Sequence, residues 1–224
     1  MNNKKTYVLI PAYNEEKVIV EVIMDIKEAG YQNIIVVDDG SSDKTYLEAK
    51  NSGVIALQHM INRGKGAAAK TSIEAAKALG ADIVVTMDGD GQHNPEDIKK
   101  MIALIEKGND VVLGTRLKNP RGMPKYKILA NYIGNLFTYI IYGLWVTDSQ
   151  SGFRAYSRKA INLIDTRTDR YEYDSEVIRE INRNKLKFVE IPIEVRYTEY
   201  SMNKQQKQGF KNGIKTLIKM IISS

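Results

Sequence analysis

The chain has 224 residues, of which 43% are hydrophobic and 27% are charged, a size and balance typical of one globular domain with a sizeable core. It contains no cysteine, which excludes a disulfide framework and a metal site built from thiolates, and which is typical of a reducing compartment. The apolar run before Pro11 covers only residues 6–10, which is too short for a signal peptide.

The formal net charge of +6 is unevenly distributed along the sequence. Residues 112–146 contain no acid but five basic side chains, namely Arg116, Lys118, Arg121, Lys125 and Lys127. Residues 201–224 contain five lysines and again no acid. This asymmetry indicates either an ordinary solvated basic face or an anionic partner for the C-terminal half: nucleic acid, a membrane surface or a phosphorylated substrate.

The first half of the chain alternates runs rich in valine and isoleucine with helical patterns. The runs predict strands at residues 6–10, 33–37, 54–57, 82–87 and 110–113. Apolar residues recur every three to four positions over residues 15–29, which predicts a helix that ends at Gly30. Asn94 and Pro95 predict the N-cap and first position of a helix that runs to about Lys107. The alternation predicts an α/β fold with a mostly parallel, Rossmann-like sheet covered by helices on both faces.

Polar loops follow three of the predicted strands. Residues 11–15 (PAYNE) follow the first strand, residues 38–43 (DDGSSD) the second and residues 88–93 (DGDGQH) the fourth. The carboxyl ends of parallel strands form the ligand-binding edge of an open α/β sheet, so we expect these loops to converge. Turn-forming residue types would explain any one loop. Three acidic loops on one edge indicate a ligand.

Two other motifs in this half are incomplete. The run that begins at Asp88 resembles an EF-hand calcium loop, but His93 stands at the sixth position, where glycine is required, and Lys99 at the twelfth, where glutamate is required. Residues 64–71 (GKGAAAKT) have the spacing of a phosphate-binding P-loop, except that alanine replaces its second glycine. Lys70 fits an alanine-rich helix better than a phosphate cradle.

The remaining interpretation of residues 88–92 is a divalent cation held by hard oxygen ligands. We expect the carboxylates of Asp88 and Asp90 and the side-chain carbonyl of Gln92 to be the ligands. Such a set suits Mg²⁺ or Mn²⁺, which bind few protein oxygens and leave other positions for water and phosphate. A cation so held would bridge a pyrophosphate.

Six motifs together resemble the family 2 glycosyltransferases. PAYNE, VDDGSSDKT, NRGKGAA, DGDGQHNPED, GTR and DSQSGFRAYS occur in that order over about residues 7–157, similar to the dolichyl-phosphate (polyprenyl-phosphate) mannose or glucose synthase group. The resemblance implies a glycosyltransferase A fold. It also implies metal-dependent transfer of a hexose, with inversion, from GDP-mannose, UDP-glucose or UDP-N-acetylglucosamine to a polyprenyl or dolichyl phosphate.

The resemblance also implies roles for individual residues. Those expected to bind the nucleotide are Pro11, Tyr13, Glu15, Val37, Asp39, Arg63, Lys65 and Asp88. The expected metal ligands are Asp88, Asp90 and Gln92, and the expected catalytic residues are Asp90 and Arg116. Those expected on the sugar and acceptor side are Arg116, Ser151, Gly152, Arg154 and Lys204. Asp39 suits its role chemically, because a carboxylate accepts a hydrogen bond from the ring N–H of uracil or guanine.

The nature of the acceptor determines whether a general base is needed. A lipid phosphate has a second pKa of about 6 and is already largely nucleophilic at neutral pH. A hydroxyl acceptor, such as a polysaccharide or glycan, would need a carboxylate base, for which Asp148 and Asp174 are candidates. The basic C-terminal half and the resemblance favour the phosphate.

Two alternatives come from other classes of protein. A sugar nucleotidyltransferase would begin with a glycine-rich loop, where this chain has PAYNE. A nucleic-acid-binding protein would suit the calculated pI of about 9.2, but its basic residues would alternate with aromatic ones and it would leave the acidic loops unexplained. We therefore expect no nucleic-acid partner.

Two segments have the pattern of amphipathic helices. Residues 128–147 are uncharged but carry polar side chains along one helical face, which predicts a helix that is buried or lies on a membrane. Residues 209–222 carry a lysine every four residues beside apolar ones. We expect a catalytic domain at 1–200, a basic membrane-associated segment at 201–224, and peripheral attachment to the cytoplasmic face of a membrane.

Overall fold

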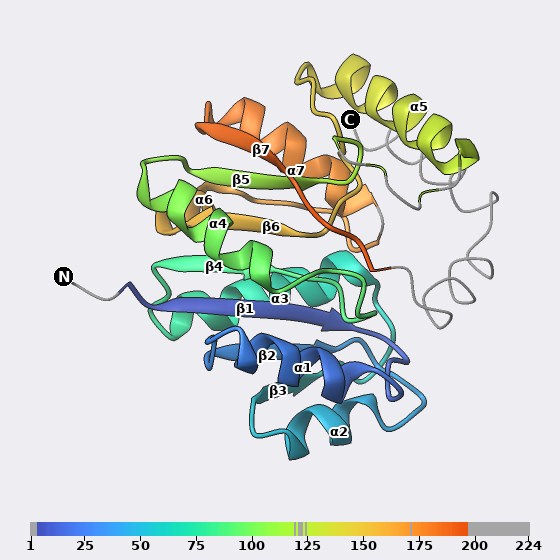
Figure 1. Cartoon of the computed structure of the whole chain (residues 1–224), viewed down its shortest axis with the longest axis vertical. Coiled ribbons are helices and arrows are strands. Elements are labelled where there is room, and N and C mark those ends of the chain that lie inside the picture. The colour runs from blue at the N-terminus through green and yellow to red at the C-terminus, as the bar shows by residue number, and fades with distance from the viewer. Residues whose placement is uncertain (1–3, 119, 121–122, 124, 171, 197–224) are drawn as a thin grey trace.

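One seven-stranded sheet organises residues 4–118, 120, 123, 125–170 and 172–196, which are the residues described by the computed structural model (Figure 1). The strands are β1 (Thr6–Ala12), β2 (Ile34–Asp38), β3 (Ile55–Gln58), β4 (Ile83–Thr86), β5 (Val111–Thr115), β6 (Arg154–Ser157) and β7 (Phe188–Pro192). Their order is β3-β2-β1-β4-β6-β5-β7. Only β6 runs antiparallel to its neighbours in this described sheet. The predicted mostly parallel sheet is confirmed, and the predicted boundary at residue 200 lies outside the described residues.

Helices cover both faces of the sheet, and each face has its own hydrophobic core. The helices α1 (Ile19–Glu28), α2 (Thr45–Asn51) and α4 (Glu96–Glu106) pack on one face. The helices α3 (Lys65–Ala78), α6 (Arg158–Leu163) and α7 (Glu172–Arg183) pack on the other. Successive residues of β1 point to opposite cores, Leu9 to the second and Ile10 to the first. Burial on both faces explains why the inner strands are continuous apolar runs.

Helix α5 (Lys125–Tyr142) lies outside these two layers, beside α7 (Figure 1). It is held there by polar contacts, since Asn182 Nδ2 donates to Tyr142 O at 2.9 Å. The sequence predicts this helix over 128–147, but it ends earlier because Gly143 has a φ of +72°, the left-handed conformation that terminates helices. Within the described part of the chain, no helix combines the length and apolarity needed to cross a membrane.

The helices α1 and α4 begin later than the sequence predicts. Residues 15–18 form a turn before α1, in which the Glu15 carbonyl accepts hydrogen bonds from the amides of Val18 and Ile19. Pro95 is the N-cap of α4 and not its first helical residue. Asn94 still satisfies one amide, because its Oδ1 accepts from Glu96 N at 3.2 Å.

The contact between α3 and the segment before α7 predicts an effect on stability. A Cβ atom on Gly66 would lie 2.6 Å from Tyr173 Cβ and 2.9 Å from Thr168 O, so Gly66→Ala should lower the free energy of unfolding by about 1–3 kcal/mol. Gly134, inside α5, has no heavy atom within 4 Å of an added Cβ. Gly134→Ala should therefore be neutral or stabilising by up to about 1 kcal/mol. Urea unfolding measures both, and equal effects would contradict the packing described.

Candidate active site

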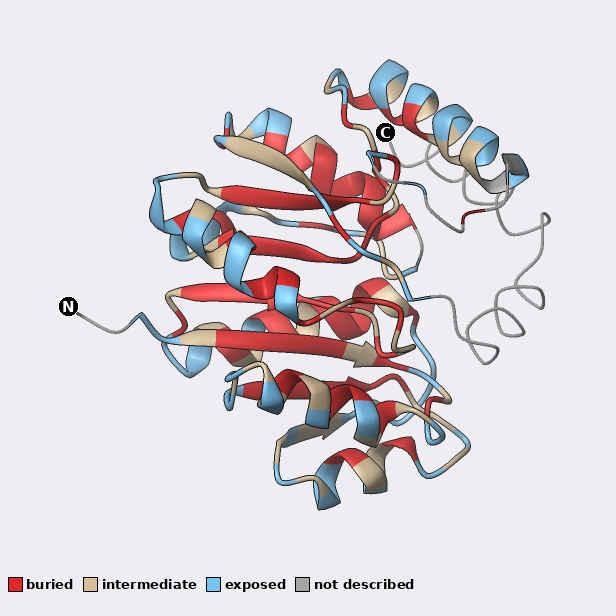
Figure 2. Cartoon of the chain, viewed as in Figure 1, coloured by how far each residue is buried: buried red, intermediate tan, exposed pale blue. Residues whose placement is uncertain are grey.

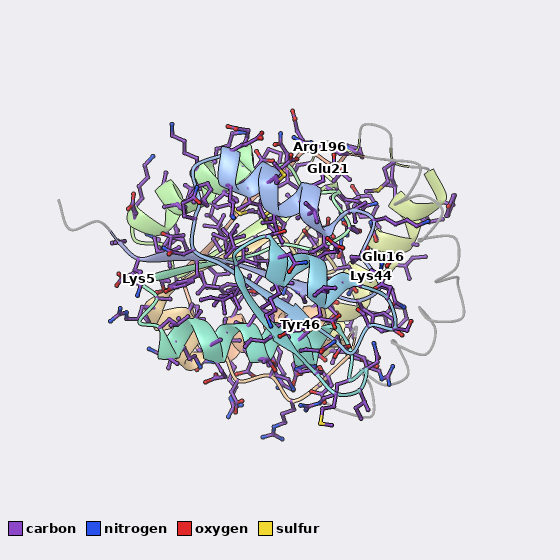
Figure 3. The ribbon with its side chains drawn as sticks, turned by 90° about the horizontal axis from the view of Figure 1, so that it is seen from below. Lys5, Glu16, Glu21, Lys44, Tyr46 and Arg196 are labelled. Atoms are coloured by element: carbon purple, nitrogen blue, oxygen red, sulfur yellow. The ribbon has the colours of Figure 1, made fainter. Side chains whose placement is uncertain are left out.

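Three loops meet at the carboxyl edge of β1, β2 and β4, as the sequence predicts. β1 is parallel to both neighbours, so the segments after the three strands emerge side by side. Asn14 N donates to Ser41 Oγ at 2.8 Å, and Lys44 N donates to Glu16 Oε2 at 3.1 Å; Figure 3 shows Glu16 and Lys44 close together. The first two loops therefore form one connected polar surface beside the third.

Asp39, at the end of β2, is buried and organises the next loop. Its Oδ1 lies 2.7 Å from His59 Nδ1 and accepts from Arg63 N at 3.1 Å, while its Oδ2 accepts from Gly64 N at 2.6 Å. The other ring nitrogen of His59 lies 3.0 Å from Thr71 Oγ1. A carboxylate offers about four acceptor positions, so these contacts fix Asp39 and leave capacity for one more donor, such as a nucleobase N–H.

The other residues predicted to bind a nucleotide differ in exposure. Tyr13 is 42% exposed, whereas Glu15 is buried and its amide donates to Thr45 Oγ1 at 2.8 Å. Val37 is completely buried and pairs with Pro11 inside the sheet. The side chain of Val37 therefore belongs to the core, and its place at the base of a nucleotide pocket stays a prediction.

Lys65, the first residue of α3, connects two carboxylates. Its Nζ lies 2.8 Å from Asp88 Oδ1 and 3.1 Å from Asp174 Oδ2 on α7. Burial would lower the pKa of Lys65, but the charges of Asp174 and Asp88 raise it above its usual value. Burial would raise the pKa of Asp88, but Lys65 and a hydrogen bond from His93 hold that pKa well below its usual range. Lys65 and Asp88 are therefore ionised at neutral pH.

Asp90 is less well compensated by its surroundings than Asp88 is. Burial and the charge of Asp88 raise the pKa of Asp90, and its Oδ1 accepts a hydrogen bond from Gln92 N at 3.1 Å. Within the described residues, no three His, Cys, Asp or Glu side chains form a metal-binding group. Two carboxylates with a neighbouring amide fit Mg²⁺ or Mn²⁺, because these ions keep positions for water and phosphate oxygen.

The antiparallel strand β6 brings the SGFR motif (residues 151–154) to the ion pair of Asp88 and Lys65. Thr86, the last residue of β4, pairs with Arg154, and its hydroxyl donates to Gly152 O at 2.7 Å. A Cβ atom on Gly152 would lie 2.6 Å from both Asp88 Oδ1 and Lys65 Nζ. Glycine at this position therefore lets the backbone lie directly against the ion pair.

The other predicted residues of this motif are buried. Arg154 is 1% exposed and donates to the carbonyls of Ser149, Ser151 and Asp174 at 2.8–2.9 Å. Arg154 therefore ties the SGFR loop to α7 from inside, and its role in shaping the sugar and acceptor side stays a prediction. Ser151 is also buried, and its Oγ has no hydrogen-bond partner within the described residues.

Arg116 follows β5 at the same edge and forms a bidentate ion pair with Asp148. Its Nε lies 2.7 Å from Asp148 Oδ2, and its Nη2 lies 2.8 Å from Asp148 Oδ1. Burial would raise the pKa of Asp148, but Arg116 outweighs burial and lowers it. Asp148 and Asp174 are thus both held by cations, which argues against either one as the general base for a hydroxyl acceptor.

Lys70 lies within α3, which begins at Lys65, so the chain has no P-loop there. Its Nζ pairs with Asp169 and also donates to Arg167 O at 3.3 Å. Arg63, predicted to bind the nucleotide, has a half-exposed side chain whose Nη2 lies 3.4 Å from another oxygen of Asp169. Arg63 and Lys70 therefore both pair with the segment before α7. Lys204 lies outside the described residues.

The sequence analysis missed the contacts that hold the DGDGQH loop. His93 Nε2 lies 3.3 Å from Asp88 Oδ2, and its ring centroid lies 4.9 Å from that of Phe153. The chain after β7 crosses this loop, where Arg196 N donates to Gln92 O at 2.8 Å. The Arg196 side chain (labelled in Figure 3) pairs with Asp25 of α1 at 2.7 Å. Only the position of His93 beside the carboxylates could have signalled these contacts.

Comparisons with known proteins agree with this arrangement. The chain is 43% identical over 225 residues to the UDP-N-acetylglucosamine–dolichyl-phosphate N-acetylglucosaminyltransferase of Methanococcus voltae, covering 90% of each protein. It is 27% identical over 225 residues to the polyprenol monophosphomannose synthase of Mycolicibacterium smegmatis, covering 94% of this chain and 84% of that protein.

The fold is similar to that of glucosyl-3-phosphoglycerate synthase from Mycobacterium tuberculosis, solved with Mn²⁺, UDP-glucose and phosphoglyceric acid. The TM-score is 0.70 at 22% identity, over 97% of this chain and 80% of that one. Residues 7–164 match the model of glycosyl transferase family 2. The chain therefore belongs to glycosyltransferase family 2 and is a glycosyltransferase with a glycosyltransferase A fold.

Proposed function

We propose that this glycosyltransferase moves a sugar from a nucleoside diphosphate donor to a polyprenyl or dolichyl phosphate at a membrane surface. The observation that carries the proposal is the Asp88 and Asp90 pair at the carboxyl edge of β4, beside the loops of β1 and β2. Among the donors expected from the sequence, UDP-N-acetylglucosamine comes first, because a relative 43% identical over 90% of this chain is named for it. GDP-mannose and UDP-glucose are the alternatives.

The donor is proposed to lie along the edge formed by the first three loops. The fixed carboxylate of Asp39 receives the N–H of the nucleobase, and Tyr13 and Arg63 lie at the rim. Asp90 and Gln92, with Asp88 directly or through water, would hold a divalent cation, which would neutralise the charge on the leaving diphosphate. The protein's part is then mostly positioning and electrostatic stabilisation.

The acceptor is proposed to be a phosphate because the site offers no unpaired general base among the candidates. Asp148 forms an ion pair with Arg116, and Asp174 forms one with Lys65. A phosphate monoester needs no such base, since its second pKa is about 6. Arg116 lies at the same edge, and its side chain is 21% exposed. We therefore assign it to the acceptor phosphate in addition to Asp148.

Helix α5 supplies a surface for the lipid. Its outward side is exposed over most of the helix (Figure 2), and the exposed apolar side chains follow a helical stripe. They are Tyr126, Leu129, Tyr132, Ile133, Leu136, Tyr139 and Ile140. The segment 112–146 that contains α5 has five basic residues and no acid. An apolar stripe in a basic segment is typical of helices that lie on anionic membranes, so we propose peripheral attachment to the cytoplasmic face.

The acceptor can be tested by a transfer assay with labelled UDP-N-acetylglucosamine and Mn²⁺. Label should pass to polyprenyl phosphate and not to the matching free polyprenol, because the alcohol lacks both an ionised nucleophile and the contact with Arg116. GDP-mannose and UDP-glucose serve as alternative donors in parallel reactions. Efficient labelling of a soluble alcohol or glycan, with none on polyprenyl phosphate, would contradict the proposed acceptor.

The proposed cation can be tested in the same assay. Excess EDTA should abolish transfer, and Asp90→Asn should reduce kcat by roughly 100-fold or more, because a cation that stabilises the leaving group contributes several kcal/mol. Asp165→Asn is the matched control, since it removes the same charge from an exposed position. Unchanged turnover in EDTA would remove the cation from the mechanism.

Membrane attachment can be tested by flotation with anionic vesicles. Replacing Leu129 and Ile140, which are 62% and 68% exposed, by aspartate should weaken vesicle binding at least about tenfold, because two apolar side chains no longer enter the lipid. The same change at Met24 and Leu47, exposed on α1 and α2, is the control and should have little effect. High salt should weaken binding by the wild type. Equal binding by both double variants would exclude the apolar face of α5 from the contact.

A further inference from the structure

Lys65 occupies a position that neither a simple nucleotide ligand nor a simple structural ion pair explains. Its ammonium lies between Asp88, on the DGDGQH loop, and Asp174, on α7. Asp174 has a 5% exposed side chain and also lies 3.6 Å from Arg154 Nη2. Gly152 packs against the pair closely enough that a Cβ would meet both Lys65 Nζ and Asp88 Oδ1. The lysine therefore touches a proposed metal ligand directly.

We propose that Lys65 is a resident counter-ion of the cation site: it neutralises Asp88 while no divalent cation is bound, and Asp174 holds it once a cation takes its place. The inference rests on the proposed function, because it presupposes that Asp88 contributes to a cation site. It makes Asp174 a positioning residue for Lys65.

The physical argument is competition for one carboxylate. An ammonium 2.8 Å from Asp88 Oδ1 occupies a position from which that oxygen could meet a divalent cation. A doubly charged ion beside it would also be repelled by the lysine. Asp174 Oδ2 also lies 3.1 Å from the ammonium. Lys65 can therefore move away from Asp88 and still keep its ion pair with Asp174. The ammonium then stays at the edge where a donor diphosphate would bind.

Two substitutions with opposite effects follow from this arrangement. Lys65→Met removes the competitor, so Mn²⁺ alone should bind more tightly, by at least about threefold. UDP should bind more weakly to the same variant, because a cation for the diphosphate is lost. Asp174→Asn removes one of the two carboxylates that pair with Lys65, so the lysine should stay on Asp88. Mn²⁺ should then bind more weakly, again by at least about threefold.

The double variant separates this mechanism from a general effect of charge. If Asp174 acts through Lys65, the Asp174→Asn effect on Mn²⁺ affinity should largely disappear when Lys65 is already methionine. If Asp174 acts only by its own negative charge, the effect should be the same in both backgrounds. Lys70→Met is the matched control, because Lys70 lies on the same helix but pairs with Asp169. It removes the same charge and should leave Mn²⁺ affinity nearly unchanged.

The experiment measures free Mn²⁺ by electron paramagnetic resonance during titration of the full chain without nucleotide, and thermal unfolding confirms that each variant is folded. Tighter binding by Lys65→Met, weaker binding by Asp174→Asn and non-additivity in the double variant would support the proposal. Unchanged or weaker binding by folded Lys65→Met, or equal effects of Lys65→Met and Lys70→Met, would overturn it. Because no transfer is measured, the counter-ion role can fail while transfer to polyprenyl phosphate succeeds, and the reverse.

Discussion

Two carboxylates one residue apart at the end of a buried strand impose the main constraint on this molecule. Asp88 is compensated by Lys65 and His93, but Asp90 is destabilised as an anion by burial and by Asp88 itself. Like charges held so close in a partly buried loop have an unfavourable interaction that a bound cation would relieve. The surrounding structure supplies one resident cation and leaves one carboxylate under-compensated, which is the electrostatic condition for binding a cation.

The sheet holds this pair in place and brings its partners to it. Parallel pairing of β1, β2 and β4 places three polar loops on one edge, which is where ligands of open α/β sheets bind. The antiparallel strand β6 lies between β4 and β5, so the SGFR loop reaches Asp88 from the opposite chain direction. Arg154 ties that loop to α7 from inside, and α7 in turn carries Asp174. The site is therefore built from elements that are distant in sequence but adjacent in the sheet.

The sequence predicts the strands β1 to β5 and the three loops. Of these strands, β1, β2, β4 and β5 are largely buried and therefore consist of continuous apolar residues. The sequence does not reveal β6 and β7, whose short segments contain Arg154 and Glu190. A charge inside a strand indicates an exposed position unless its partners are known, and here the partners are three distant carbonyls around Arg154. Motif order predicts the residues of the candidate site, but which of their side chains are buried depends on tertiary packing.

The most direct test of this account is a crystal structure of the chain with Mn²⁺ and a nucleoside diphosphate, with the metal located by its anomalous scattering. We expect one Mn²⁺ in contact with Asp90 and with the diphosphate, and the Lys65 ammonium on Asp174. A diphosphate bound along the DGDGQH loop with no metal between it and Asp90 would contradict the account. So would a metal in contact with neither Asp88 nor Asp90.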